Sequence, residues 1–145
     1  MNIAIIGAGN VGGALARSWA AKGHQVHLGL RSTGQAEWEG VENISQHLVA
    51  EAVALSEVIL VALPIKAVVE VAQQLGDLSG KVLIDATNSL FAKPAPYATG
   101  YQAFKELTGA EVAKCFNSTG FENMIDPKYG DQGIDMFMAG ESPCC

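Results

Sequence analysis

Cysteine is rare in this chain, and positive charge is scarcer than negative charge. The 145 residues include three cysteines, nine Lys and Arg, and 15 Asp and Glu, which give a formal net charge of −6. Cys144 and Cys145 are adjacent and cannot easily pair with each other, and Cys115 is left over, so we expect no disulfide framework. A surface that binds nucleic acid needs clustered cations facing the phosphates. We therefore expect no nucleic-acid partner.

Long hydrophobic runs are lacking too. The longest apolar runs, such as 58–63, are far shorter than the roughly 20 residues that cross a bilayer. The N-terminus leads directly into the apolar run Ile3–Ile6 without a basic segment before it, so the sequence predicts no export signal. These features predict a cytoplasmic protein with no membrane partner.

Apolar residues make up 49% of the chain, which favours one folded domain over residues 1–145. Short apolar runs alternate with helical patterns along the whole length, as in β-α-β units that build a parallel sheet. The predicted fold class is therefore α/β, with a doubly wound, mostly parallel sheet. Strands are predicted over 2–6, 25–30, 42–44, 58–63, 81–85, 112–116 and 134–139, and helices over 11–22, from Ser45 to the mid-fifties, and over 65–75 and 100–107.

The sharpest motif is a G-x-G-x-x-G between the first predicted strand and the first predicted helix. It reads Gly7-Ala8-Gly9-Asn10-Val11-Gly12. In this position such glycines form a tight turn, admit a pyrophosphate close to the backbone, and let the helix pack on the strand, as in the Rossmann NAD(P)-binding fold. The alternative is a glycine-rich turn with a purely structural role. The position of the motif favours dinucleotide binding.

The residues after the second predicted strand indicate which dinucleotide binds. An acidic residue there would bind the ribose diol of NAD, but this chain has Arg31, followed by Ser32 and Thr33. A guanidinium and two hydroxyls favour a 2′-phosphate, so NADP(H) is the predicted cofactor. The alternative is that Arg31 is simply a solvated charge.

Loops after the later strands should complete the crevice, because ligands bind at the carboxyl ends of the strands in open α/β sheets. Their amides and hydroxyls could orient a carboxamide or a flat heterocycle, or they could only cap loops. The candidates are Leu63, Pro64 and Asn88 on the cofactor side, and Ser89, Asn117 and Ser118 on the substrate side.

No catalytic acid or base stands out, so the catalytic residues stay unknown. His24, His27 and His47 lack the spacing of a metal site, and no metal is predicted. Asp85 ends an apolar strand and could be catalytic or could bind the amides of the following loop. Cys115 is flanked by apolar residues, as a buried thiol would be. Hydride transfer between two cofactors does not need a catalytic acid or base, since the cofactors themselves react and the protein orients them.

Four blocks of sequence carry a family resemblance. They are Ile3–Gly12, Gly29–Ser32, Val82–Asn88 and Val112–Ser118. With them the chain resembles the coenzyme F420-dependent NADP oxidoreductase family, and it is also similar to the reductase domains of the six-transmembrane metalloreductases. The resemblance implies an NADPH-dependent enzyme that moves hydride between NADP(H) and F420 or a flavin-like acceptor, with the second ring system near Asn88 and Asn117.

The C-terminal end departs from that family. The last predicted strand is followed at once by 141–145, so the domain is expected to be cut short there, leaving a substrate side that is incomplete or is completed by a second copy in a homo-oligomer. A second hypothesis is a non-catalytic NADP-binding module that senses redox state. Reduction of an imine or β-hydroxy acid would need a helical second domain that 145 residues cannot hold. The expected partner is a small redox-active molecule.

Overall fold

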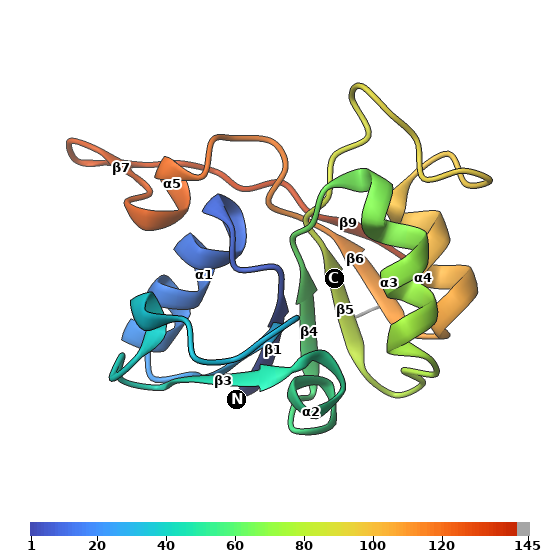
Figure 1. Cartoon of the computed structure of the whole chain (residues 1–145). Coiled ribbons are helices and arrows are strands. Elements are labelled where there is room, and N and C mark those ends of the chain that lie inside the picture. The colour runs from blue at the N-terminus through green and yellow to red at the C-terminus, as the bar shows by residue number, and fades with distance from the viewer. Residues whose placement is uncertain (142–145) are drawn as a thin grey trace.

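Seven strands form the central sheet in the computed structural model, which describes residues 1–141 (Figure 1). Their order is β3-β2-β1-β4-β5-β6-β9, and every neighbouring pair is parallel except β6 and β9. The strands span Asn2–Ile6 (β1), Gln25–Leu30 (β2), Ile44–Leu48 (β3), Val58–Val61 (β4), Val82–Asp85 (β5), Glu111–Lys114 (β6) and Ala139–Gly140 (β9).

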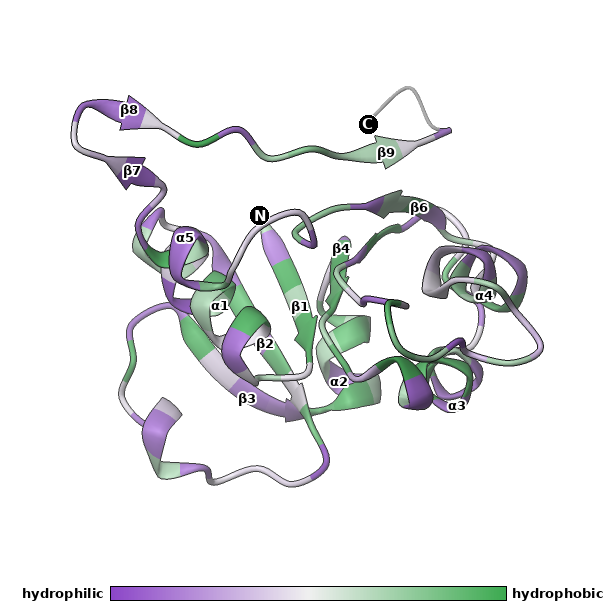
Figure 2. Ribbon diagram, turned by 90° about the horizontal axis from the view of Figure 1, so that it is seen from above, coloured by the Kyte–Doolittle hydropathy of each residue, from purple (hydrophilic) through white to green (hydrophobic). Residues whose placement is uncertain are grey.

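Helices cover both faces of the sheet, which confirms the doubly wound Rossmann architecture. Figure 2 shows α1 and α5 on one side of the strands and α2, α3 and α4 on the other. The helices span Asn10–Ala21 (α1), Val49–Ala54 (α2), Val68–Leu75 (α3), Gly100–Thr108 (α4) and Glu122–Ile125 (α5). Short 3₁₀ turns lie at Ala36–Trp38 and Ile65–Ala67.

The core consists of two apolar layers, one on each face of the sheet. Along β1, Ile3 and Ile5 pack on the α1 side, while Ala4 and Ile6 pack on the opposite side. All four are buried, because a parallel strand between two helix layers has no solvent-facing side. This explains why a continuous apolar run, and not an alternating one, marks the first strand.

The prediction for residues 42–54 was partly wrong. The strand is Ile44–Leu48, not 42–44, and the helix begins at Val49 rather than at Ser45. Ser45 pairs with His27 of β2 in the parallel ladder, and its hydroxyl lies 2.9 Å from the His27 ring. Pairing with β2 overrides the local capping preference of serine. His47 therefore lies on a strand and not on a helix.

The C-terminal part also differs from the prediction. The strand predicted over 134–139 is wrong for residues 134–138, which form no strand, and only the two-residue β9 follows them. Before this segment the chain forms α5 and a hairpin of β7 (Lys128–Tyr129) and β8 (Gln132–Gly133). The hairpin lies at the outer end of the segment that follows α5, and β9 returns along β6 (Figures 1 and 2). Cys144 and Cys145 lie outside the described residues.

Smaller differences concern the ends of elements. The strands predicted over 58–63 and 112–116 stop at Val61 and Lys114. The helix predicted over 65–75 starts as a 3₁₀ turn, and α3 proper begins at Val68. The residues that are left out of β4 and β6 belong to loops at the carboxyl edge of the sheet, where a ligand site is expected.

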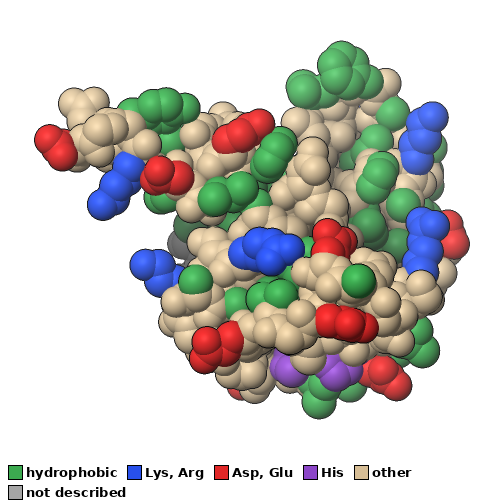
Figure 3. Space-filling model, turned by 60° about the vertical axis from the view of Figure 1, so that its left-hand side comes forward, with side chains coloured by type: hydrophobic (Ala, Val, Ile, Leu, Met, Phe, Trp, Pro, Cys, Tyr) green, Lys and Arg blue, Asp and Glu red, His purple; other side chains and the backbone are tan. Residues whose placement is uncertain are grey.

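Charged side chains do not form a basic patch on the face seen in Figure 3, where Lys and Arg stand apart with acidic side chains among them. Across residues 1–141 there is no helix long and apolar enough to cross a membrane.

Candidate functional site

Two of the three motif glycines are required by the fold itself. Gly7 follows β1 with φ +100°, and a Cβ there would lie 2.4 Å from the carbonyl oxygen of Ala62 and 2.7 Å from Cδ2 of Leu63. A Cβ on Gly12 would lie 1.8 Å from the carbonyl oxygen of Gly7. Gly7 thus lets the β1 and β4 loops touch, and Gly12 lets α1 pack against the end of β1.

At Gly9, neither a positive φ nor a close contact with another backbone atom requires glycine. Its backbone is extended, with φ −75° and ψ −159°, a conformation open to any residue. A Cβ on Gly9 would meet no atom within 4 Å. The space next to Gly9 is therefore open, which is what the close approach of a ligand to the backbone requires.

The start of α1 adds positive potential to that space. Gly9 is the N-cap residue, no side chain caps the helix, and its first turn contains no acidic residue. The N–H groups of the first turn therefore have no partner within the helix, and the helix dipole adds about half a positive charge there. A diphosphate fits this position in both charge and hydrogen bonding.

The predicted 2′-phosphate site lies just beyond β2. Arg31, Ser32 and Thr33 are all exposed, and within residues 1–141 the Arg31 guanidinium forms no hydrogen bond or ion pair. The guanidinium is thus available to a ligand. The loop after Thr33 is fastened to α1 by Trp38, whose ring lies under the Arg17 guanidinium at 4.4 Å and within 3.5 Å of a Cβ built on Gly13. The sequence did not predict this packing of Trp38 against α1.

Leu63 and Pro64 lie in the loop after β4, which faces the glycine turn. The Ala62 amide donates to the Ile6 carbonyl at 3.0 Å, which holds this loop alongside the end of β1. The point between β1 and β4 is where the strand order reverses, and it is the crevice in which doubly wound folds bind ligands.

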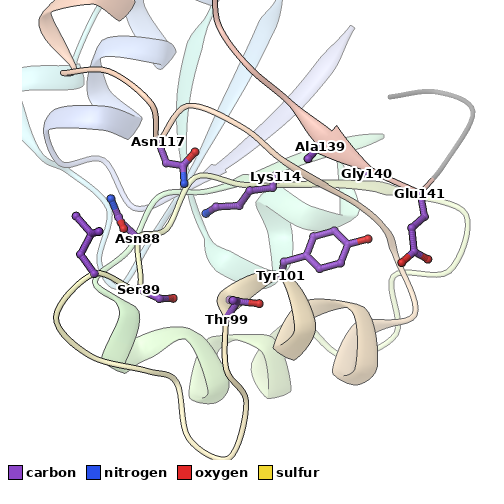
Figure 4. A pocket seen from close by; sticks show the side chains of 11 residues that line it. Asn88, Ser89, Thr99, Tyr101, Lys114, Asn117, Ala139, Gly140 and Glu141 are labelled. Atoms are coloured by element: carbon purple, nitrogen blue, oxygen red, sulfur yellow. The ribbon is translucent and has the colours of Figure 1, made fainter.

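A cavity of about 660 Å³ opens at the carboxyl ends of β5 and β6 (Figure 4). It brings together Asn88, Ser89 and Asn117, three of the predicted residues. Ser118 is not among the lining residues, and its hydroxyl instead lies 3.5 Å from the sulfur of Met136. The remaining lining residues were not predicted as site residues. They are Leu90, Thr99, Gly100, Tyr101, Lys114, Ala139, Gly140 and Glu141.

An ion pair lies beneath this cavity. Asp85 is fully buried, and its Oδ2 lies 3.2 Å from Nζ of Lys114. Its Oδ1 accepts a hydrogen bond from the Thr87 amide at 2.8 Å, and Lys114 also donates to the Thr87 carbonyl. Asp85 thus binds the amide of the following loop, one of its two predicted roles, and being fully buried it is not exposed to a ligand.

Helix α4 closes tightly over this ion pair. A Cβ on Gly100 would lie 2.4 Å from Oγ1 of Thr87 and 3.1 Å from Oδ2 of Asp85. Among the described residues, the Thr87 hydroxyl and Asp85 Oδ2 are buried without a hydrogen-bond partner, apart from the ion pair of Asp85 with Lys114. Gly100 is therefore required for the first turn of α4 to approach the end of β5.

The end of β6 carries an unusual backbone conformation. Phe116 has φ +59°, a left-handed conformation that is rare for a bulky side chain and is often found at functional sites. Its ring packs edge-on against Trp19 at 5.8 Å, so the chain turns there and delivers Asn117 to the cavity. Burial raises the pKa of the neighbouring Cys115 thiol, which disfavours a role for it as a nucleophile.

His27 on β2 and His47 on β3 face each other, with 3.4 Å between Nδ1 of His27 and Nε2 of His47. The Ser45 hydroxyl lies between them. Burial, and then the charge of His47, lowers the pKa of His27. The described part of the chain holds no group of three or more His, Cys, Asp and Glu side chains that could bind a metal ion.

The sequence of this chain matches a known protein family. Residues 2–89, more than half of the chain, match the family described as NADP oxidoreductase, coenzyme F420-dependent. The chain belongs to this family. The matched segment contains the glycine loop, Arg31 with Ser32 and Thr33, the loop after β4, and Asn88. Membership of this family establishes an NADP-dependent oxidoreductase, with NADP(H) as its cofactor.

Solved structures share the fold. A protein from Arthrobacter sp. FB24, provisionally named an F420-dependent NADP reductase, superimposes with a TM-score of 0.79 at 22% identity, over 99% of this chain and 75% of its own. A hypothetical protein from Sinorhizobium meliloti gives 0.78 at 24% identity, with the same coverage. A reductive aminase from Aspergillus terreus, in complex with NADPH and ethyl levulinate, gives 0.62 at 19% identity over 84% of this chain and 43% of its own. No curated protein matches the sequence.

Proposed function

We propose that this protein transfers hydride between NADP(H) and a deazaflavin (F420) or a flavin-like acceptor. The observation that carries the proposal is the open space at Gly9, which neither the backbone conformation nor the packing explains. Family membership supports NADP(H) as the dinucleotide for this space. NADPH would supply the hydride, while the protein supplies orientation and electrostatic stabilisation.

The cofactor would lie along the carboxyl edge of the sheet. The diphosphate would bind the amides of residues 7–12, where Ala8, Asn10 and Val11 accompany the three glycines, and the 2′-phosphate would bind Arg31 with Ser32 and Thr33. Leu63 and Pro64 would lie beneath the middle of the molecule. Asn88 would then receive the nicotinamide end, because it follows β5, on the far side of the β1–β4 switch point from Arg31.

The cavity next to Asn88 is where the acceptor would bind. Its volume of about 660 Å³ lies within the usual range of small-molecule sites, and Tyr101 and Leu90 offer apolar surface for a ring system. Ser89 and Asn117 provide hydrogen-bonding groups on its wall. Ser118 would belong to this side only if its contact with Met136 were released.

The test combines binding with turnover. Calorimetry with NADPH and NADH measures the cofactor preference, and the loss of absorbance at 340 nm measures oxidation of NADPH when F420, FMN or FAD is offered. We expect preferential binding of NADPH and its oxidation by at least one acceptor. Binding without turnover with all three acceptors would contradict the enzymatic proposal and favour the redox-sensing module.

A further inference from the structure

The acceptor cavity contains one cation among the described residues that line it, the ammonium of Lys114. Figure 4 shows its side chain running from β6 into the cavity, between Asn117 and Tyr101. The Lys114 side chain is 24% exposed and is among the residues that line the cavity. A cation in a small-molecule cavity fits a ligand that carries or gains negative charge.

The ammonium is held in a fixed orientation. A lysine ammonium has three N–H donors, and here one is directed to the Thr87 carbonyl. Oδ2 of Asp85 lies 3.2 Å from the ammonium as an ion pair without a hydrogen bond, so within the described structure two donors have no hydrogen-bond acceptor. Because Asp85 is fully buried and itself held by the Thr87 amide, the whole arrangement is rigid before any ligand binds.

Stability alone gives no reason for such a pair. Replacing a buried ion pair with apolar residues of similar volume is often neutral or stabilising. Thr87 and Asp85 each also keep a buried oxygen without a hydrogen-bond partner within the described structure. An ion pair whose lysine lines a cavity and whose carboxylate is buried and incompletely hydrogen-bonded is what a preorganised electrostatic site would contain.

Resting on the proposed function, we propose that the cavity binds the flat ring system of the acceptor and that Lys114 donates a hydrogen bond to the ring edge where negative charge develops. During transfer the C4–H bond of the dihydronicotinamide breaks, and a new C–H or N–H bond forms on the central ring of the acceptor. The electron pair displaced in that ring would move to its pyrimidine edge, which would carry the resulting negative charge. Lys114 keeps its own protons and stabilises the edge electrostatically.

Asp85 is a positioning residue in this arrangement. It does not reach the cavity surface, and it acts by fixing the direction of the Lys114 ammonium. Gly100 lets α4 cover the pair, which keeps water from screening it.

The first variant is Lys114→Met, compared with Lys114→Arg, which keeps the charge. Lys114→Met leaves the Asp85 carboxylate buried without a counterion and can fail to fold, so a double variant with Asp85→Asn and Lys114→Met removes both charges together. Lys128→Met is the matched control, because Lys128 is exposed on β7 and does not line the cavity.

The primary readout is binding, not activity. Fluorescence titration gives the dissociation constants of the oxidised acceptor and, under anaerobic conditions, of the reduced acceptor, with F420 and FMN as probes. In Lys114→Met and in the double variant, the reduced acceptor should bind about 100-fold more weakly and the oxidised acceptor less than fivefold more weakly, with the hydride-transfer rate about 100-fold lower. Lys114→Arg should restore part of each loss, and Lys128→Met should match the wild type.

Two failures can be told apart. If the wild type reduces an acceptor and the double variant keeps the wild-type ratio of reduced to oxidised affinity, the role of Lys114 is wrong while the proposed function stands. If the wild type binds NADPH but reduces none of the acceptors, the proposed function is wrong and the role of Lys114 is wrong with it.

Discussion

Replacing Gly9 with alanine should separate ligand binding from folding. The extended backbone of Gly9 is open to alanine, and the new methyl group would meet no atom within 4 Å. Alanine is a poorer N-cap than glycine, but it also lowers the entropy of the unfolded chain, and these two effects largely offset each other. We expect the free energy of unfolding to change by less than about 1 kcal/mol.

NADPH binding should respond very differently. The methyl group of Gly9→Ala would occupy the space through which the diphosphate reaches the amides of α1. Loss of one charge-assisted hydrogen bond costs about 1.5–3 kcal/mol. Since about 1.4 kcal/mol corresponds to a tenfold change in affinity, the dissociation constant for NADPH should rise about 10- to 140-fold. Isothermal calorimetry measures this change, and urea unfolding measures the stability of the same sample.

Gly12→Ala is the matched comparison. Its Cβ would lie 1.8 Å from the Gly7 carbonyl oxygen, a backbone atom that cannot swing aside. This variant should lose about 3 kcal/mol of stability or more, as severe overpacking does. The reasoning is refuted if Gly9→Ala binds NADPH within twofold of the wild type, or if it is destabilised as strongly as Gly12→Ala.

Three further predictions test other parts of the structure. Arg31→Ala should weaken NADPH by about 1.5–3 kcal/mol and leave NADH almost unchanged in calorimetry; equal losses would contradict its assigned role. Gly100→Ala should cost about 1–3 kcal/mol in urea unfolding, because its Cβ would lie 2.4 Å from Oγ1 of Thr87; an unchanged midpoint would show that α4 does not close on β5. The lowered pKa of His27 means that the unfolded chain takes up a proton below about pH 6.5 that the folded chain resists, so stability should fall from pH 7.5 to 5.5. His27→Gln should reduce that slope in thermal unfolding, and an unchanged slope would assign it to other groups.

The structure of the glycine loop could be predicted from sequence because one local pattern determines it. A buried strand, a tight turn and the start of a helix each have a recognisable sequence pattern, and all three patterns occur within the first 12 residues, around Gly7–Gly12. Arg31 was predictable for the same reason, since its position follows directly from the end of β2.

The ion pair of Lys114 with Asp85 at the cavity could not be predicted in this way. Lys114 and Asp85 are 29 positions apart, and only the parallel pairing of β5 with β6 brings them face to face. Strand β9 has only two residues and pairs with β6 in the opposite direction, too short a segment for any periodicity to indicate. Ser45 favours a helix cap locally, yet pairing with β2 places it in a strand. In all three cases the structure depends on contacts between segments that lie far apart in the sequence.

A crystal structure with NADPH bound is the most direct test of the cofactor site. The diphosphate oxygens should lie about 2.7–3.2 Å from first-turn amides of α1, next to Gly9, and the 2′-phosphate should contact the Arg31 guanidinium. A diphosphate bound elsewhere on the protein, or a 2′-phosphate directed away from Arg31, would contradict the account.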